Sequence, residues 1–363
     1  MRPYVFVIDR LGPYGAQRVC VTLLEEFAKA GHRVVLITYA DDHPEAPLLS
    51  HSIERIKVPR SDAKWAALGQ VVFSLRQTLR TLKPAAVLAF MPLANICTLM
   101  ATRGSGIPVY VSEHNIPSMA MRLTSFRSFC LWIGMWFWYP RASGVITVSQ
   151  DVKTALIAYL RRPRMHVRVI YNPVDYKRLS TESPAYIQAS ADIARWHASI
   201  GKPDCLVIVG ALKEAKGHSI AIDALKLLPA RYQLVFVGEG PLRKELLNRA
   251  DIAGLGGRVH FVGEYKNVTA WMTLAHTVLV PSRWEGFGLV VAEAAYVKAR
   301  VITSDALGVR EIALIVGATV CRLDSTSLAE AIAHTGAFTR KQVWVNEFNP
   351  ELVASRYLES MKS

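Results

Sequence analysis

Two carboxylates eight residues apart, Glu285 in a glycine-containing loop and Glu293 in the helix expected after it, form a pattern that suits a phosphorylated ligand with hydroxyl groups. The loop, residues 282–288, follows an apolar run typical of a buried parallel strand, and residues 289–297 have helical composition. A strand end followed by a helix N-terminus favours phosphate, and nearby carboxylates accept hydrogen bonds from sugar hydroxyls. The whole string therefore suggests a nucleotide-sugar, whereas the acid pair alone is better explained by a structural strand, loop and helix with one solvated Glu.

The string Pro281-Ser-Arg-Trp-Glu-Gly-Phe-Gly288, followed by Glu293, resembles the signature of family 4 retaining glycosyltransferases, which have the GT-B fold. The resemblance implies that Glu285 is catalytic and contacts the donor sugar, and that Glu293 contacts the ribose. The other expected donor-binding residues of this string are Gly286, Phe287, Gly288 and Leu289.

Residues 209–217 resemble the phosphate loop of the same family. The resemblance implies that Lys216 contacts the donor diphosphate. The position at which the family carries Arg reads Ala211, so one cation is missing from the leaving-group side. Lys213 is the nearest candidate replacement in the sequence, although Lys and Arg are not equivalent at phosphate.

Two shorter strings in the first half also resemble this family. Residues 14–18 match its first glycine-containing loop at Gly15 but carry Tyr14 beside it, and the family role implied for the Gly15 amide is contact with the diphosphate. Residues 108–115 resemble a strand found in members that build lipid-linked oligosaccharides. That match implies that His114 is catalytic and lies beside the donor sugar.

Alternating strand and helix patterns must position these residues, which predicts an α/β fold with parallel sheets. The resemblance implies the GT-B arrangement, in which two Rossmann-like domains face each other across a cleft. We expect an acceptor domain at 1–175, a nucleotide-sugar domain at 176–345 that begins with a linker, and a helix at 346–363 that crosses back to the first domain. Residues 176–203 are predicted to be polar and irregular.

Composition limits the other possibilities. The chain has 363 residues, 51% of them hydrophobic, and five scattered cysteines without CxxC spacing. These cysteines argue for a reducing compartment and against zinc or a disulfide framework. Asp41-Asp42-His43 could suggest a metal site, but a solvated turn before Pro44 is the simpler interpretation, so no metal or other cofactor is expected. The N-terminus predicts a strand rather than a signal peptide.

The formal charge of +14 is concentrated in one half of the chain. Residues 1–180 hold 23 Lys and Arg against 11 Asp and Glu, whereas residues 181–363 hold 20 against 18. Such a basic surface suits an anionic membrane, and no nucleic-acid motif is present, so no nucleic-acid partner is expected. A basic but unspecialised surface is the alternative.

Residues 119–139 are the most apolar part of the chain, with an uninterrupted core of 11 residues, 129–139. This core is too short to span a bilayer. Flanking arginines and three tryptophans, Trp132, Trp136 and Trp138, are typical of a membrane interface. A buried helix of the first domain and a helix lying in the membrane surface both remain open.

The combined interpretation is a retaining, metal-independent hexosyltransferase. It would move a sugar from a nucleoside-diphosphate sugar, expected to be a UDP-sugar, to a hydroxyl of a saccharide or lipid-linked acceptor. We expect a role in polysaccharide, lipopolysaccharide or glycan assembly, in the cytoplasm and peripheral to the inner membrane face. The alternative is a non-catalytic glycosyltransferase-like partner protein, which Ala211 and Tyr14 would favour.

Overall fold

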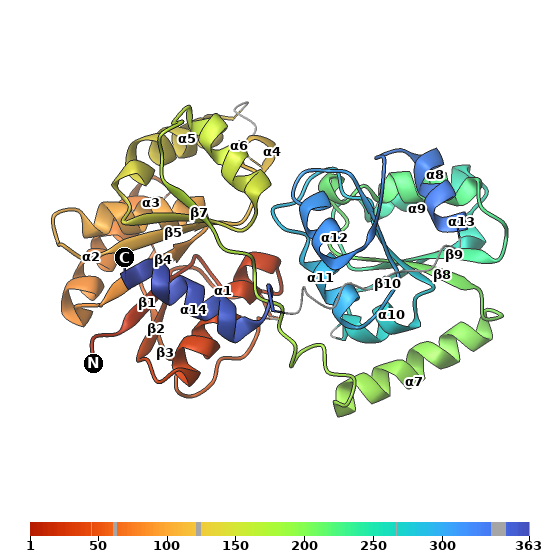
Figure 1. Ribbon diagram of the computed structural model, residues 1–363, viewed down its shortest axis with the longest axis horizontal. Coiled ribbons are helices and arrows are strands. Elements are labelled where there is room, and N and C mark those ends of the chain that lie inside the picture. Colours follow the sequence, from red (N-terminus) through yellow and green to blue (C-terminus); the bar gives the residue numbers. More distant parts are fainter. Residues whose placement is uncertain (45, 61–63, 121–124, 266, 335–345, 363) are drawn as a thin grey trace. The chain divides into compact units, whose positions relative to one another are not determined.

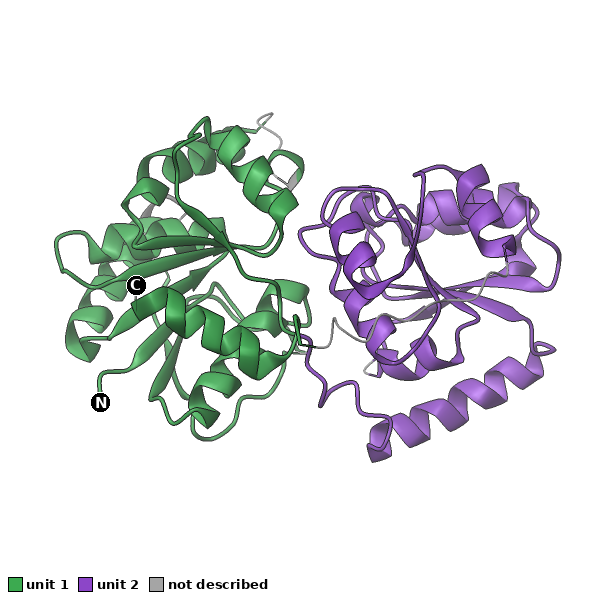
Figure 2. Cartoon of the chain, in the orientation of Figure 1, with its two compact units in different colours: residues 1–173, 346–363 green, residues 174–345 purple. Residues whose placement is uncertain are grey.

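The computed structural model describes residues 1–363 except 45, 61–63, 121–124, 266, 335–345 and 363. The chain forms two compact units (Figure 2). Unit 1 comprises Met1–Pro173 with Asn346–Ser363, and unit 2 comprises Val174–Val345. Each unit contains one parallel sheet with helices on both faces, so the predicted α/β class is confirmed (Figure 1).

Unit 1 is built on a seven-stranded sheet with the order β3-β2-β1-β4-β5-β6-β7. Its central strands are short apolar runs buried on both faces, as parallel strands under helices require. The strands are β1 Tyr4–Val7, β2 Val34–Thr38, β3 Glu54–Lys57, β4 Ala86–Phe90, β5 Val109–Glu113, β6 Gly144–Thr147 and β7 Val167–Val169. The helices are α1 Gly15–Lys29, α2 Lys64–Leu82, α3 Pro92–Thr102, α4 Pro117–Ala120, α5 Phe126–Trp138, η1 Tyr139–Arg141, α6 Gln150–Leu160 and α14 Pro350–Lys362.

The last helix, α14, belongs to unit 1 and packs against α1 (Figure 1). Its first turn is capped by Asn349, whose Oδ1 accepts a hydrogen bond of 3.1 Å from the backbone N–H of Leu352. Tyr357 on this helix is fully buried. Asn349 therefore fixes the start of α14, which falls inside the segment expected to be helical.

Helix α5 is buried on one side only, and its exposed side is also apolar, so a wholly buried helix is excluded and a helix lying in the membrane surface stays a prediction. One side packs on α3 through the buried Met135 and the half-buried Trp132, whose indole N–H donates to the Tyr159 carbonyl at 2.9 Å. The other side is exposed to solvent. Its exposed side chains are Phe126, Phe129, Ile133, Trp136 and Phe137.

Unit 2 is built on a six-stranded sheet with the order β10-β9-β8-β11-β12-β13. Both sheets thus run outward in two directions from their first strand, which is the doubly wound arrangement. The strands are β8 Asp204–Val209, β9 Tyr232–Val237, β10 Val259–Gly263, β11 Thr277–Val280, β12 Val301–Ser304 and β13 Thr319–Cys321. The helical segments are α7 Pro184–Ser199, η2 Glu214–Lys216, α8 His218–Lys226, α9 Arg243–Ile252, η3 Gly256–Arg258, α10 Val268–Leu274, α11 Leu289–Tyr296, α12 Arg310–Val316 and α13 Ser325–Ala333.

The prediction of an irregular segment at 176–203 is wrong, because α7 occupies much of it. Ser183 caps this helix by accepting a hydrogen bond of 3.2 Å from the backbone N–H of Tyr186, and Pro184 stands at the first helical position. Ala189 and Ile193 are buried against β8 and α10. The apolar stripe is only a few residues wide, which is why the polar composition hid the helix.

Candidate functional site

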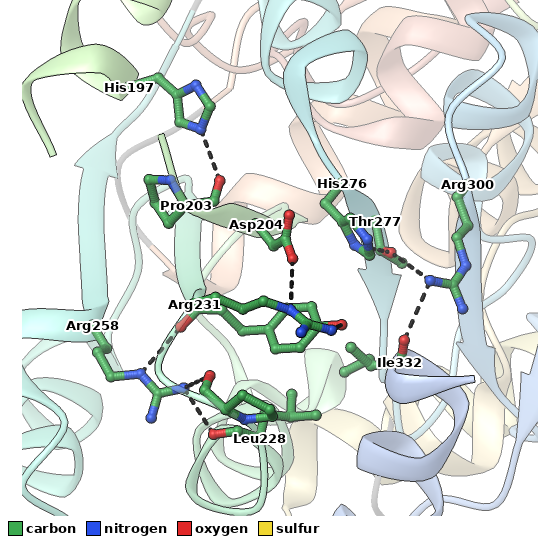
Figure 3. Close-up of polar contacts among 12 residues, drawn as sticks. His197, Pro203, Asp204, Leu228, Arg231, Arg258, His276, Thr277, Arg300 and Ile332 are labelled. Carbon is green, nitrogen blue, oxygen red and sulfur yellow. Dashed lines mark hydrogen bonds and ion pairs between the residues drawn. The ribbon is translucent and has the colours of Figure 1, made fainter. Parts of the chain in front are cut away.

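Arginine side chains form an ion pair and hydrogen bonds to backbone carbonyls around the amino ends of the unit 2 strands (Figure 3). Arg231 pairs with Asp204 at 3.0 Å, and Arg258 donates to the Tyr232 and Leu228 carbonyls. Arg300 donates to the carbonyls of Ala331 and His334. These contacts satisfy backbone acceptors at the edge where strands begin. In doubly wound sheets, ligands bind at the opposite edge, beyond the carboxyl ends of the strands.

The carboxyl ends of β8 and β11 bring together two residues that the sequence places 69 positions apart. Lys216 Nζ lies 2.5 Å from Glu285 Oε1, and Ser282 Oγ donates to the same oxygen at 3.0 Å. Ser282 is held in turn by Ser304 Oγ, which donates to its carbonyl at 2.5 Å. Strands β8 and β11 flank the point at which the strand order reverses, where doubly wound sheets bind ligands.

Two glycines allow the loops of this site to touch backbone to backbone. A Cβ on Gly217 would lie 1.9 Å from the Pro281 carbonyl oxygen, and one on Gly308 would lie 2.0 Å from the Glu285 carbonyl oxygen. Both glycines have positive φ, 64° and 77°. The loops are also joined by backbone hydrogen bonds from Arg283 N to Ala215 O at 2.7 Å and from Glu285 N to Leu307 O at 3.1 Å.

The expected donor-binding string lies at the start of α11. Gly288 caps the helix in the left-handed conformation, with φ of 75°, and Leu289 is the first helical residue. Gly286 and the buried Phe287 precede it in the loop after β11. The free backbone N–H groups and the positive dipole end of α11 therefore follow Glu285 by only a few residues in the chain.

Glu293 lies in the second turn of α11 and is buried. Its Oε1 is 3.1 Å from Arg178 Nη1, an ion pair that the sequence analysis did not foresee. Arg178 belongs to the segment that opens unit 2, and Tyr176 of the same segment stacks on Tyr296 of α11 with ring centroids 4.4 Å apart. This segment therefore packs along the helix that carries Glu293.

His218, the first residue of α8, is a second unforeseen residue close to Lys216. Its side chain is 2% exposed and meets the Phe236 ring edge-on, with centroids 5.2 Å apart. Burial, with the positive charge of Lys216 as a smaller cause, lowers the pKa of His218 to about 4. The imidazole is neutral near pH 7, so Lys216 supplies the charge at this loop.

The other two expected residues, His114 and Gly15, belong to unit 1. His114 follows β5, stacks on Phe90 with ring centroids 5.5 Å apart, and shares a hydrogen bond of 3.0 Å between its Nε2 and Ser112 Oγ. Burial lowers its pKa to about 3, so it too is neutral. Its Nδ1 is buried without a hydrogen-bond partner among the residues that the structure describes.

Gly15 is the first residue of α1, and Tyr14 precedes it at the N-cap position. The Tyr14 ring is half exposed and meets His43 edge-on, with centroids 6.0 Å apart. His43 does not assemble a metal site with its neighbours. Asp42 accepts a hydrogen bond of 2.8 Å from Leu11 N and pairs with Arg55 at 2.6 Å. Among the residues that the structure describes, no three His, Cys, Asp or Glu side chains are grouped as metal ligands.

Two family models match the chain in tandem. The one described as Glycosyltransferase Family 4 matches residues 13–178, which include Gly15 and His114. The one described as Glycosyl transferases group 1 matches residues 191–333, which include the Lys216–Glu285 pair and Glu293. The chain belongs to the family 4 glycosyltransferases.

Relatives and solved structures are similar over most of this glycosyltransferase. The chain is 24% identical over 299 residues to the GalNAc-alpha-(1->4)-GalNAc-alpha-(1->3)-diNAcBac-PP-undecaprenol alpha-1,4-N-acetyl-D-galactosaminyltransferase of Campylobacter jejuni, covering 80% of this chain and 76% of that protein. It is 26% identical over 304 residues to the N-acetylgalactosamine-N,N'-diacetylbacillosaminyl-diphospho-undecaprenol 4-alpha-N-acetylgalactosaminyltransferase of the same organism, covering 82% and 79%.

The fold is shared with Alr3699/HepE from Anabaena, solved in complex with UDP and glucose. That structure is 21% identical in sequence and has a TM-score of 0.80, and the match covers 100% of this chain and 100% of that chain. The expected GT-B fold is confirmed. None of the described helices of this glycosyltransferase combines the length and apolar character that crossing a membrane requires.

We predict that Gly308→Ala will impair nucleotide binding, because the new Cβ must displace the Glu285 carbonyl. Gly254→Ala is the matched control: its φ of 69° is also positive, but nothing lies within 4 Å of the added Cβ. The control carries only the left-handed strain, about 1–2 kcal/mol. Urea unfolding and calorimetric titration with UDP measure the two effects. Equal losses in both variants would show that the close contact at Gly308 is unimportant.

Proposed function

We propose that this glycosyltransferase moves a sugar from a UDP-sugar to a hydroxyl of a lipid-linked saccharide, with retention of anomeric configuration. The Lys216–Glu285 pair, 2.5 Å apart beside the start of α11, is the observation that carries this proposal. The choice of UDP is supported by the UDP and glucose bound to HepE. The choice of acceptor is supported by two relatives whose names specify diphospho-undecaprenol or PP-undecaprenol saccharides.

In the proposed reaction the sugar–phosphate bond breaks and negative charge accumulates on the departing diphosphate. Lys216 Nζ, the backbone N–H groups that begin at Gly288 and the α11 dipole would stabilise that charge. These groups can act without a metal ion. Ala211 supplies no cation, and Lys213, two positions further along the same loop, is the nearest basic residue in the sequence.

The two carboxylates would hold hydroxyl groups on either side of the diphosphate. Glu285, oriented by Lys216 and Ser282, would accept hydrogen bonds from the donor sugar. Glu293 would accept them from the ribose, and Arg178 at 3.1 Å would hold this buried carboxylate in place. A charge-assisted hydrogen bond contributes about 1.5–3 kcal/mol, so both contacts matter for donor affinity.

Neutral His114 suits a role beside the sugar rather than beside the phosphate. Its buried Nδ1 lacks a partner among the described residues, and a sugar hydroxyl would satisfy it. With no ionised base in this position, the departing phosphate oxygen would take the proton of the acceptor hydroxyl as the new glycosidic bond forms. That proton transfer on one face of the sugar is consistent with retention.

The proposed activity is tested by mass-spectrometric detection of product from a panel of nucleotide-sugars and bacterial lipid extract. We expect transfer from a UDP-sugar to a polyprenyl diphosphate saccharide, undiminished in EDTA because cationic side chains and amides replace a metal. Activity lost in EDTA and restored by Mg²⁺ would contradict the leaving-group chemistry. Absence of transfer with every donor, despite UDP binding, would favour a non-catalytic partner protein.

Lys216→Met should weaken UDP binding by about 1–3 kcal/mol, because it removes the cation proposed to contact the diphosphate. Lys226→Met is the matched control, since Lys226 is exposed at the far end of α8. Calorimetric titration of both variants with UDP and with uridine distinguishes phosphate contact from base contact. Unchanged UDP affinity in Lys216→Met would remove this residue from the donor site.

We further propose that unit 1 docks on anionic membranes through the exposed side of α5. Exposed arginines lie at both ends of this helix and just after α6: Arg127, Arg141, Arg161 and Arg164. The Arg141 guanidinium stacks 3.8 Å from the Phe137 ring centroid, and that of Arg162 stacks 4.1 Å from the Trp136 ring. Aromatic side chains with stacked guanidinium groups suit the boundary between acyl chains and anionic headgroups.

Ile133→Glu should reduce binding to phosphatidylglycerol vesicles by tenfold or more, the equivalent of about 1.5–3 kcal/mol for one buried aliphatic side chain. Ile252→Glu places the same charge at a more exposed isoleucine of unit 2 and should bind as the wild type does. Vesicle flotation at low and high salt measures both variants. Wild-type protein that fails to bind at low salt would exclude this surface as a membrane contact.

A further inference from the structure

Glu113, the last residue of β5, is a buried carboxyl group for which the proposed reaction has no use. Its side chain is 1% exposed, although His114 follows it directly. Side chains alternate along a strand, so Glu113 shares a face with Val109 and Val111, which pack in the same core cluster as Tyr139. His114, stacked on Phe90, lies towards the other face.

Three elements meet at this carboxyl group. Asn95 of α3 donates from Nδ2 to Glu113 Oε1 at 2.9 Å, and the hydroxyl of Tyr139 in η1 donates to the same oxygen. Asn95 Nδ2 also lies 3.0 Å from the Tyr139 hydroxyl and 3.2 Å from the Ser112 carbonyl. The network therefore joins η1, which continues α5, to the end of the strand that carries His114.

The groups around Glu113 supply hydrogen bonds but no positive charge. Asn95 faces it from α3, Tyr139 from η1, and Thr147 is its register partner on β6. None of the ion pairs formed between described residues includes Glu113. Burial raises its pKa to about 7, while the hydrogen bonds from Tyr139 and Asn95 act in the opposite direction. A carboxyl group kept in this setting is costly compared with an apolar residue of similar size.

We propose that Glu113 is a positioning residue that couples α5 to the backbone at His114 through Tyr139 and Asn95. When α5 docks on a lipid surface, movement at its C-terminal end reaches β5 through this network and adjusts the segment that holds His114. The lipid step rests on the proposed function. The link between Tyr139 and Glu113 stands on the contacts alone.

Hydrogen exchange on the full chain tests that link without requiring activity. Tyr139→Phe removes only the hydroxyl donor, and exchange at residues 114–116 should accelerate about tenfold, the equivalent of one lost hydrogen bond. Tyr39→Phe is the matched control, because Tyr39 lies in the same core cluster and its buried hydroxyl has no partner among the described residues. Unchanged exchange at 114–116 in Tyr139→Phe would overturn the proposal.

The pH dependence of turnover distinguishes a positioning role of Glu113 from a merely structural one. Both donors suit an ionised carboxyl group, so turnover of the wild type should fall as the pH drops through about 7. Glu113→Gln should lose this step, and Tyr139→Phe should move it to higher pH, because one hydrogen bond to the carboxylate is gone. A wild-type profile in both variants would contradict the coupling.

The lipid step has its own readout. Phosphatidylglycerol–phosphatidylethanolamine vesicles should slow exchange in α5 of all variants, but slow exchange at 114–116 only where Tyr139 is intact. Vesicles that protect α5 while leaving 114–116 of the wild type unchanged would overturn transmission from the membrane. Failure of the wild type to bind vesicles would instead refute membrane docking, and the Tyr139→Phe exchange would still decide the link.

Discussion

Close backbone contact between three loops is the constraint on which the unit 2 site depends. Gly217 admits the Pro281 carbonyl and Gly308 admits that of Glu285, and in each case a single Cβ would lie about 2 Å from a backbone oxygen. Contact between these loops brings the backbones of Lys216 and Glu285 close enough for their side chains to pair. The path of residues 209–217 is thus constrained by backbone packing at Gly217.

The two units share a doubly wound strand order, but the charged and titratable residues of their candidate sites lie in different surroundings. In unit 2, the candidate carboxylates are paired with cations at close range, Glu285 with Lys216 and Glu293 with Arg178. In unit 1, burial keeps His114 neutral and raises the pKa of Glu113 to about 7. A neutral imidazole cannot offset the charge of a departing diphosphate. If the proposed reaction is correct, that charge must be met by Lys216 and the α11 N-terminus.

Local sequence patterns predicted those strands and helices whose formation depends on residues close together in the chain. The strand before the loop at 282–288 and the helix at 289–297 follow from an apolar run and helical composition, and the structure has β11 at Thr277–Val280 and α11 at Leu289–Tyr296. Helix α7 was missed because its buried stripe is narrow and its composition polar. The partner of Glu293 could not be found in this way, since Arg178 lies 115 positions away and reaches it only through the folded unit.

The burial of Glu113 is another feature that local sequence patterns could not predict. In the sequence it reads as one more polar residue after a strand, beside the histidine that the family resemblance singles out. Only the fold reveals that it faces away from His114, towards Asn95 and Tyr139, and that burial changes its proton affinity. Adjacent residues of one strand end thus have opposite environments, because a strand sends successive side chains to opposite faces. A change in the core behind β5 can therefore reach His114 through the backbone that the two residues share.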